Sequence, residues 1–279
     1  MQLFKTKDGN ILRADGKSFK IDTNWDTIVN QKNLHNYLSA LTKGDPMNEA
    51  DADKSIANGV MAPIGTQEVW AAGVTYLRSR DARMEESKDS GGDFFYQKVY
   101  DADRPELFFK AVAHRVVGTG AEVRIRKDSK WDVPEPELTL FINSEGSIQA
   151  YTAGNDMSSR SIEGENPLYL PQAKMYEGSC ALGPCLFIPA HPISSETNIA
   201  ITISRKAKKV FDATIQLNRM KRQLPELASW LFKEMKFSNG CYLMTGTGLV
   251  PGNDFTLQPG DVVAISIDGI GTLRNIVAS

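Results

Sequence analysis

Three carboxylates stand at a spacing that could hold a divalent cation. Glu135 and Glu137 lie two residues apart at the start of an apolar run, so an extended chain directs both side chains to one face. A turn at 144–146 precedes a second strand that ends at Asp156, and a hairpin would return this carboxylate beside the first two. Oxygen ligands of this kind suit Mg²⁺, with Mn²⁺ or Ca²⁺ as substitutes. On spacing alone, the alternative is an exposed acidic strand start followed by an Asn-Asp turn.

The elements that would position these carboxylates are mostly strands. Short apolar segments follow one another towards the C-terminus, separated by Gly, Pro and Asn-Asp turns: 68–74, 107–112, 121–126, 137–143, 148–152, 199–204, 210–216, 262–267 and 272–277. Helical spacing predicts helices at 77–88 and 225–235. Many strands with few helices predict an α+β, mostly β fold, a folded-over sheet or β-roll rather than alternating βαβ units.

The N-terminal part reads as a separate small unit. Strand candidates 2–5 and 11–13 flank a turn signal, and apolar residues recur at helical spacing over 25–41. Residues 44–63 are rich in Asp, Ala, Asn, Gly and Pro, which predicts a linker. We therefore expect a small α+β domain over residues 1–64 and a catalytic domain over residues 65–279.

Composition argues against several classes of partner. The chain has 32 Lys and Arg against 34 Asp and Glu, and a net charge of −2 is unlike the basic footprint of a nucleic-acid binder. No apolar run approaches the roughly 20 residues that span a membrane. The three cysteines have no CxxC spacing, and the N-terminus has no apolar signal core. We expect a cytoplasmic protein with neither nucleic acid nor membrane as partner.

Taken together, these residues resemble the fumarylacetoacetate hydrolase superfamily from about residue 69 onwards. The landmarks stand in the superfamily's order: Gly73-Val-Thr-Tyr76, Phe108-Phe-Lys110, Glu135-Pro-Glu137, Tyr151-Thr-Ala-Gly-Asn155-Asp156, Lys174, Leu182-Gly-Pro184, Thr245-Gly-Thr247 and Pro259-Gly-Asp261. The resemblance implies the superfamily's β-roll and a homodimer or homotetramer. It also implies that Glu135, Glu137 and Asp156 hold the divalent metal.

The first landmark departs from the superfamily's hydrolases. Those enzymes usually read GxNYxxHxxE, in which the His and Glu activate water, whereas Ser79 and Ala82 stand at these positions here. Residues 75–87 and 155–174 instead look like the branch of 2-keto-3-deoxy-pentonate dehydratases. This resemblance implies a Mg²⁺-dependent dehydration of a small 2-keto acid to 2,5-dioxopentanoate (α-ketoglutarate semialdehyde) through a metal-chelated enolate.

Two residues are expected to move protons or stabilise charge. We assign Glu106 as the acid/base that serves the leaving C4 hydroxyl; the alternative is a solvated loop glutamate. Lys174 aligns with the superfamily lysine and would either stabilise the enolate or abstract the C3 proton. The alternative for Lys174 is a surface charge.

Three further residues are expected to contact the substrate. Ser79 replaces the catalytic histidine position, and Arg78 beside it has a guanidinium fork suited to carboxylates or hydroxyls. The same helix carries Arg83. The alternative for Arg78, Ser79 and Arg83 is a solvated helix face. Thr247 resembles the superfamily's contact to the substrate carboxylate, with a simple turn as its alternative.

Two other function classes stay open at this point. One is C–C bond hydrolysis of an acylpyruvate-like diketo acid, or decarboxylation of a β-keto acid, by the same superfamily. The other is a weakened homologue that only binds a keto acid. Ser79 and Ala82 count against hydrolysis, and the intact carboxylates count against a mere binder.

Overall fold

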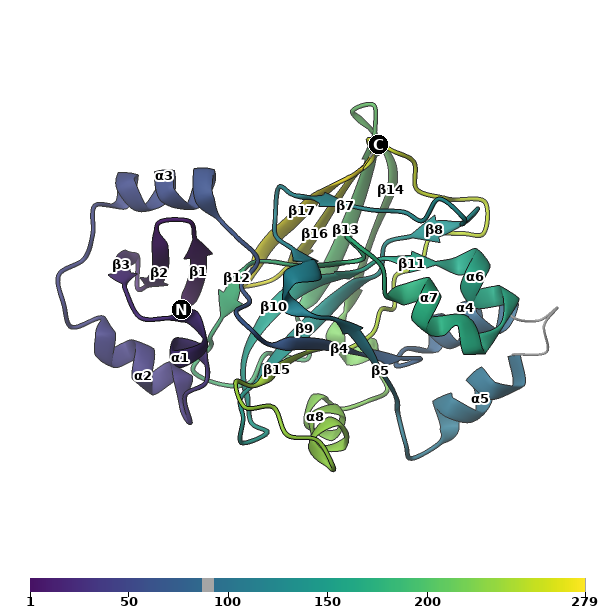
Figure 1. The fold of residues 1–279 in the computed structure, drawn as a ribbon, viewed down its shortest axis with the longest axis horizontal. Helices are drawn as coiled ribbons and strands as arrows, with labels where there is room; N and C mark the ends of the chain where they lie inside the picture. The colour runs from purple at the N-terminus through teal and green to yellow at the C-terminus, as the bar shows by residue number, and fades with distance from the viewer. Residues whose placement is uncertain (87–92, 279) are drawn as a thin grey trace.

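Two β-sheets form the body of the protein in the computed structural model, which describes residues 1–86 and 93–278 (Figure 1). The first sheet contains β3 (Lys17–Ile21), β2 (Gly9–Ala14), β1 (Gln2–Thr6), β12 (Cys180–Phe187), β10 (Ile148–Asp156), β9 (Pro136–Ile142), β15 (Cys241–Met244), β4 (Glu68–Gly73) and β5 (Glu106–Ala111) in that order, with β6 (Val116–Val117) beside β12. The second contains β14 (Lys208–Gln216), β13 (Asn198–Arg205), β16 (Val262–Ile267), β17 (Gly271–Val277) and β7 (Glu122–Val123). A short pair joins β8 (Asp132–Val133) to β11 (Ser158–Ser159).

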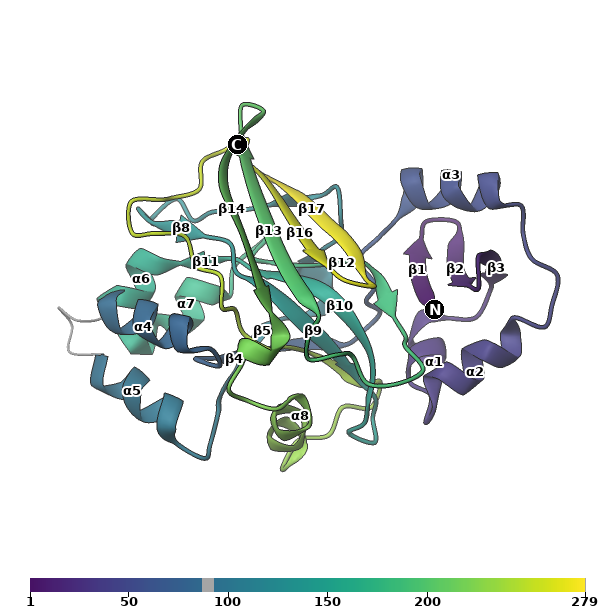
Figure 2. The same ribbon diagram turned by 180° about the vertical axis from the view of Figure 1, so that it is seen from behind.

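The helices gather at opposite ends of the first sheet. Three accompany the N-terminal strands: α1 (Trp25–Val29), α2 (Leu34–Leu41) and α3 (Glu49–Gly59). Four cluster at the far end of the molecule (Figure 1): α4 (Leu77–Glu86), α5 (Asp93–Asp101), α6 (Arg160–Glu165) and α7 (Leu170–Lys174). The remaining α-helix, α8 (Leu224–Phe232), lies beneath the roll, and the view from behind shows the second sheet covering the first (Figure 2).

Strand β9 is the centre of the fold because it is buried on both faces. Leu138, Leu140 and Ile142 point into the core between the two sheets, where β13, β16 and α8 meet them. Phe141 points the other way, into a second core shared with the N-terminal unit and Tyr242 of β15. This alternation fixes the register of β9, since a one-residue slip would exchange the two faces.

The α+β, mostly β fold expected from the sequence is confirmed, and so are most of its strands. The helix expected over 25–41 is wrong in one respect, because it breaks between α1 and α2 at residues 30–33. The linker expected at 44–63 is also wrong: Asn48 caps α3 there, and Ala52 packs against β1. Strand β12 and helices α5 to α7 were not predicted.

The N-terminal unit continues the main sheet, since β1 pairs with β12 at Gln2 and Leu3. A boundary at residue 64 remains a prediction. Within the described residues, no helix is both long and apolar enough to cross a membrane.

Candidate metal and substrate site

The β9–β10 hairpin brings the three predicted carboxylates together. Glu137 lies opposite Gly154 in the ladder, and the backbone N–H of Asp156 donates to the carbonyl of Glu135 at 3.0 Å. Each carboxylate offers an oxygen within 4.8 Å of the others, and the residues are only 1–4% exposed. The expected convergence is therefore confirmed, and the alternative of an exposed acidic strand start is wrong. Metal binding itself stays a proposal.

Two cations hold Glu135 in its ionised form. Lys174 Nζ lies 2.6 Å from Glu135 Oε2 and 3.0 Å from Asp156 Oδ2, and Arg160 Nη2 lies 2.5 Å from Glu135 Oε1. Burial alone would raise the pKa of Glu135, but Lys174 and Arg160 outweigh it and lower the pKa to about 2. Lys174, at the end of α7, is fully buried and so is not the surface charge of the alternative reading.

Glu137 has a different environment. The backbone N–H of Gly246 donates to Glu137 Oε2 at 2.6 Å. Gly246 has a φ of +89°, and a Cβ there would lie 2.1 Å from Thr75 Oγ1, so a larger residue would not fit. Burial, and then the charges of Asp156 and Glu135, hold the pKa of Glu137 well above its ordinary value. Such crowding of buried carboxyl groups is what a bound cation relieves.

Lys110 completes the cluster, and the sequence reasoning assigned it no role. Its ammonium group lies 2.5 Å from Asp156 Oδ1 and donates to the carbonyl oxygens of Met157, at 3.1 Å, and Lys174. The side chain is fully buried at the end of β5. A lysine inside an apolar strand, Leu-Phe-Phe-Lys-Ala, was the available signal, because such a lysine is rarely buried without a partner.

Glu106 begins β5 and faces Gly73 of β4 across the ladder. A Cβ on Gly73 would lie 1.9 Å from Glu106 Oε2, so the carboxyl group occupies the space above this glycine. Burial raises the pKa of Glu106, although the positive charges of Arg83 and Lys174 oppose the rise. The solvated loop glutamate is therefore wrong, and a carboxyl group of this kind can keep a proton to donate.

The turn from β4 into α4 is strained. Val74 has a φ of +54°, which is rare for a β-branched residue, and it lies beside the carboxylates. Thr75 Oγ1 anchors the turn by donating to the carbonyl of Thr245 at 2.7 Å. The Thr75 hydrogen bond thus helps to fix where α4 begins, and with it the position of Ser79, which is 7% exposed.

A small cavity lies between the carboxylates and α4. Its free volume is about 10 Å³, room for about one water, so a keto acid enters only if the lining moves. The lining includes the predicted residues Ser79, Glu135, Glu137, Asp156, Lys174 and Thr247. Arg78 and Glu106 are not among them. Arg78 lies exposed on the outer face of α4, whereas Arg83 faces the cavity instead, and Glu106 lies against Gly73, which does line the cavity. The structure thus corrects the expectation that Arg78 lies at the site.

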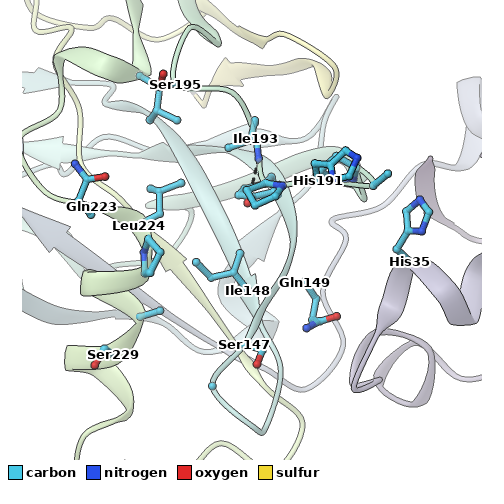
Figure 3. Close-up of a pocket in the computed structure, with 18 of the residues that line it drawn as sticks. His35, Ser147, Ile148, Gln149, His191, Ile193, Ser195, Gln223, Leu224 and Ser229 are labelled. Carbon is cyan, nitrogen blue, oxygen red and sulfur yellow. Dashed lines mark hydrogen bonds between the residues drawn. The ribbon is translucent and has the colours of Figure 1, made fainter.

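A much larger groove of about 830 Å³ lies elsewhere, between the N-terminal unit and the roll (Figure 3). His35 and His191 line it, with Gln149 and Gln223. Among the described residues that line this groove there is no carboxylate, so its larger volume does not make it the better candidate for a metal and substrate site. We place the site at the small cavity because the ionisable groups converge there.

The chain is similar to known proteins over most of its length. A family model described as fumarylacetoacetate (FAA) hydrolase C-terminal matches residues 69–278. A probable 2-keto-3-deoxyxylonate dehydratase of Haloferax volcanii is 46% identical over 228 residues, which cover 81% of this chain and 78% of the relative. A 2-dehydro-3-deoxy-D-arabinonate dehydratase of Saccharolobus solfataricus is 41% identical over 217 residues, covering 77% of this chain and 72% of the relative.

Solved structures extend the similarity to the whole chain. A 2-keto-3-deoxy-D-arabinonate dehydratase complexed with magnesium and 2,5-dioxopentanoate is 33% identical, with a TM-score of 0.84. The match covers 100% of this chain and 99% of that structure, so the N-terminal unit has a counterpart there as well.

Proposed function

Because the chain belongs to the fumarylacetoacetate hydrolase C-terminal family, we propose that it is a Mg²⁺-dependent dehydratase that converts a 2-keto-3-deoxy-pentonate to 2,5-dioxopentanoate. The observation that carries the proposal is the pairing of a buried three-carboxylate cluster with Glu106, a half-buried residue whose Oε2 atom is buried and whose pKa is raised by burial. The first suits a divalent cation, and the second suits proton donation to a leaving hydroxyl.

The donor set fits magnesium. Glu135, Glu137 and Asp156 supply only oxygen atoms, and among the described residues no histidine or cysteine joins them, as a zinc site would require. When bound, Mg²⁺ would hold the carboxylate and ketone oxygens of the keto acid and polarise the ketone as a Lewis acid. Mn²⁺ or Ca²⁺ would fit the same ligands.

The residues around the metal ligands have separable roles in this proposal. Glu106 donates its proton to the C4 hydroxyl as it leaves, which needs the protonated form that burial favours. Lys174 lies between Glu135 and Asp156; in this proposal its amino group accepts the C3 proton, and the resulting ammonium group stabilises negative charge on the neighbouring substrate oxygens. Thr247 lines the cavity beside Gly246, where the substrate carboxylate would lie.

Two variants and one isotope test these roles. In deuterated buffer with Mg²⁺, Glu106→Gln should still exchange the C3 protons of the pentonate but form dioxopentanoate about 10²- to 10⁴-fold more slowly. Lys174→Met should lose both exchange and dehydration. Product would be measured through a coupled semialdehyde dehydrogenase. Near-native product formation by Glu106→Gln would remove Glu106 from the mechanism.

The same assay separates the other functions. Cleavage of an acylpyruvate by wild-type protein that leaves the pentonates intact would point to a C–C hydrolase, and metal-dependent keto-acid binding without turnover would point to a binder. Ala82, which is buried and does not line the cavity, supports dehydration over water activation.

We also propose a homodimer or homotetramer in the cytoplasm, with an N-terminal domain over residues 1–64 and a catalytic domain over residues 65–279. The family resemblance supports the oligomer and the domain division, and light scattering of the purified protein tests the oligomer.

A further inference from the structure

The cavity has a second wall opposite the metal ligands, and α4 forms it. Ser79 and Arg83 stand one helical turn apart on this face and are 7% and 4% exposed. Arg78 lies on the outer face of the same helix. Arg83 is a buried arginine in the lining of the cavity, and it forms an ion pair with Glu163 of α6, which is not one of the three metal-ligand candidates.

Arg83 is held in place from two sides. Its guanidinium group pairs with Glu163 of α6, which is 1% exposed, and lies 5.6 Å from the ring centre of Tyr96 on α5. Glu163 is fixed in turn, since Ser158 Oγ donates to Glu163 Oε2 at 3.1 Å. These contacts orient the guanidinium group before a ligand arrives, which lowers the entropic cost of binding one.

The position of Arg83 assigns it to one end of the substrate. Gly246 and Thr247 lie on the Glu137 side, where the Gly246 N–H donates to that carboxylate. Arg83 lies on the other wall, because it belongs to α4 and is held there by Glu163 of α6. A keto acid whose carboxylate lies near Thr247 and whose C4 lies near Glu106 would extend its remaining hydroxyl group towards Arg83.

We propose that Arg83 determines specificity by binding the distal hydroxyl groups of the sugar acid, an inference that rests on the proposed dehydratase function. A guanidinium group presents several N–H donors in one plane and can contact two neighbouring oxygens at once. Pyruvate-like acids, which have the carboxylate and the ketone but no hydroxyl, would gain nothing from it. The chain would thereby distinguish sugar acids from simple keto acids.

The test uses variants that avoid an unpaired buried charge. Arg83→Met/Glu163→Gln removes both members of the ion pair, since removing one alone would leave the other charge buried. Arg83→Lys keeps a positive charge but loses the planar fork. Arg78→Met is the matched control, because it removes an arginine from the outer face of the same helix. For each protein, kcat and KM are measured for the pentonate, together with the inhibition constant of pyruvate and the Mg²⁺ affinity.

We expect kcat/KM for the pentonate to fall about 10- to 100-fold in the double variant and less in Arg83→Lys, because hydrogen bonds to a charged group are lost. In the double variant, pyruvate inhibition and Mg²⁺ affinity should change far less than kcat/KM, because Lys174 and Arg160 still pair with Glu135. Every parameter of Arg78→Met should stay unchanged. Wild-type kcat/KM in the double variant would overturn the inference. An equal loss of pyruvate and pentonate affinity would also overturn it, because Arg83 would then only support the site.

The two proposals fail in different ways. If wild-type protein forms no product from a pentonate, the dehydratase function fails. Arg83 is then judged by calorimetric affinities for the unreacted pentonate and for pyruvate. A wild-type preference for the pentonate that disappears in the double variant supports the role of Arg83, and the absence of any such preference overturns it.

Discussion

Asp132 of β8 should make the protein less stable as the pH rises, and Asp132→Asn should remove this effect. The residue is 3% exposed, and among the described residues its Oδ1 atom has no hydrogen-bond partner. Burial raises its pKa from 3.8 to about 6, although a hydrogen bond from Ser129 and the charge of Arg126 oppose the rise. The folded protein therefore binds the proton more tightly than the unfolded chain does.

The sign and size follow from proton linkage. Below pH 3.8 the carboxyl group is protonated in both states and contributes nothing. Between pH 3.8 and about 6 the folded state holds more protons, so stability falls as the pH rises, and above about 6 the penalty is complete. The difference between the unfolded-state pKa of 3.8 and the folded-state pKa of about 6 lowers the free energy of unfolding by up to about 3 kcal/mol, at about 1.4 kcal/mol per pKa unit.

Urea unfolding of the wild type and of Asp132→Asn, from pH 4 to pH 8 in EDTA, measures the effect. The stability of the variant relative to wild type should rise by up to about 3 kcal/mol across this range, a midpoint shift of about 1 M urea. The control Asp128→Asn changes an exposed carboxylate whose pKa is lowered by its hydrogen bond from Arg126, so it should show no such gain. A difference between Asp132→Asn and wild type that does not change with pH would refute the reasoning.

Three further changes probe the site. Lys110→Met leaves the buried Asp156 without a partner on one side, so it should cost about 3–5 kcal/mol, seen as a melting temperature lower by about 10 °C. Gly73→Ala places a methyl group against Glu106 Oε2, so kcat should fall about 10²-fold, while the melting temperature with Mg²⁺ should change far less than in Lys110→Met. Mg²⁺ at 100 times its Kd should raise the free energy of unfolding by about 2.7 kcal/mol relative to the protein in EDTA. Glu137→Gln should largely lose this increase. An equal increase in that variant would remove Glu137 from the metal ligands.

The metal end of the site was predictable because it is local in sequence. Glu135, Glu137 and Asp156 lie on one hairpin, and the period of two along a strand together with the hairpin return is enough to bring them together. The roles of Glu106 and Lys174 came from the family resemblance, because their burial depends on contacts between β4 and β5 and on the end of α7. No local pattern reveals those contacts.

The α4 wall could not be predicted for a different reason. The helix carries Arg78, Arg80 and Arg83 and has no apolar stripe to mark its inner face. The face that turns inwards is set by Glu163 on α6, some 80 residues later, which pairs with Arg83. Sequence reasoning accordingly selected Arg78, which lies next to Ser79 in the chain but on the other side of the helix.

Helix α6 connects the two ends of the site. Its Arg160 pairs with the metal-ligand candidate Glu135, and one turn later Glu163 pairs with Arg83 of α4. The carboxylate cluster is built by β9 and β10, whereas the cavity-facing side chains of α4 are held through α6, so separate elements form the two walls of the site. In the sequence pattern of the superfamily's hydrolases, a His and a Glu stand at the positions of Ser79 and Ala82. This chain instead turns Ser79 and Arg83, four residues apart, towards the cavity, and Ala82 packs away from it. Ser79 and Ala82, at the positions of that His and Glu, supply no base to activate water, whereas the Ser79 hydroxyl and the Arg83 cation can bind hydroxyl groups. The same metal cluster would then serve elimination rather than hydrolysis.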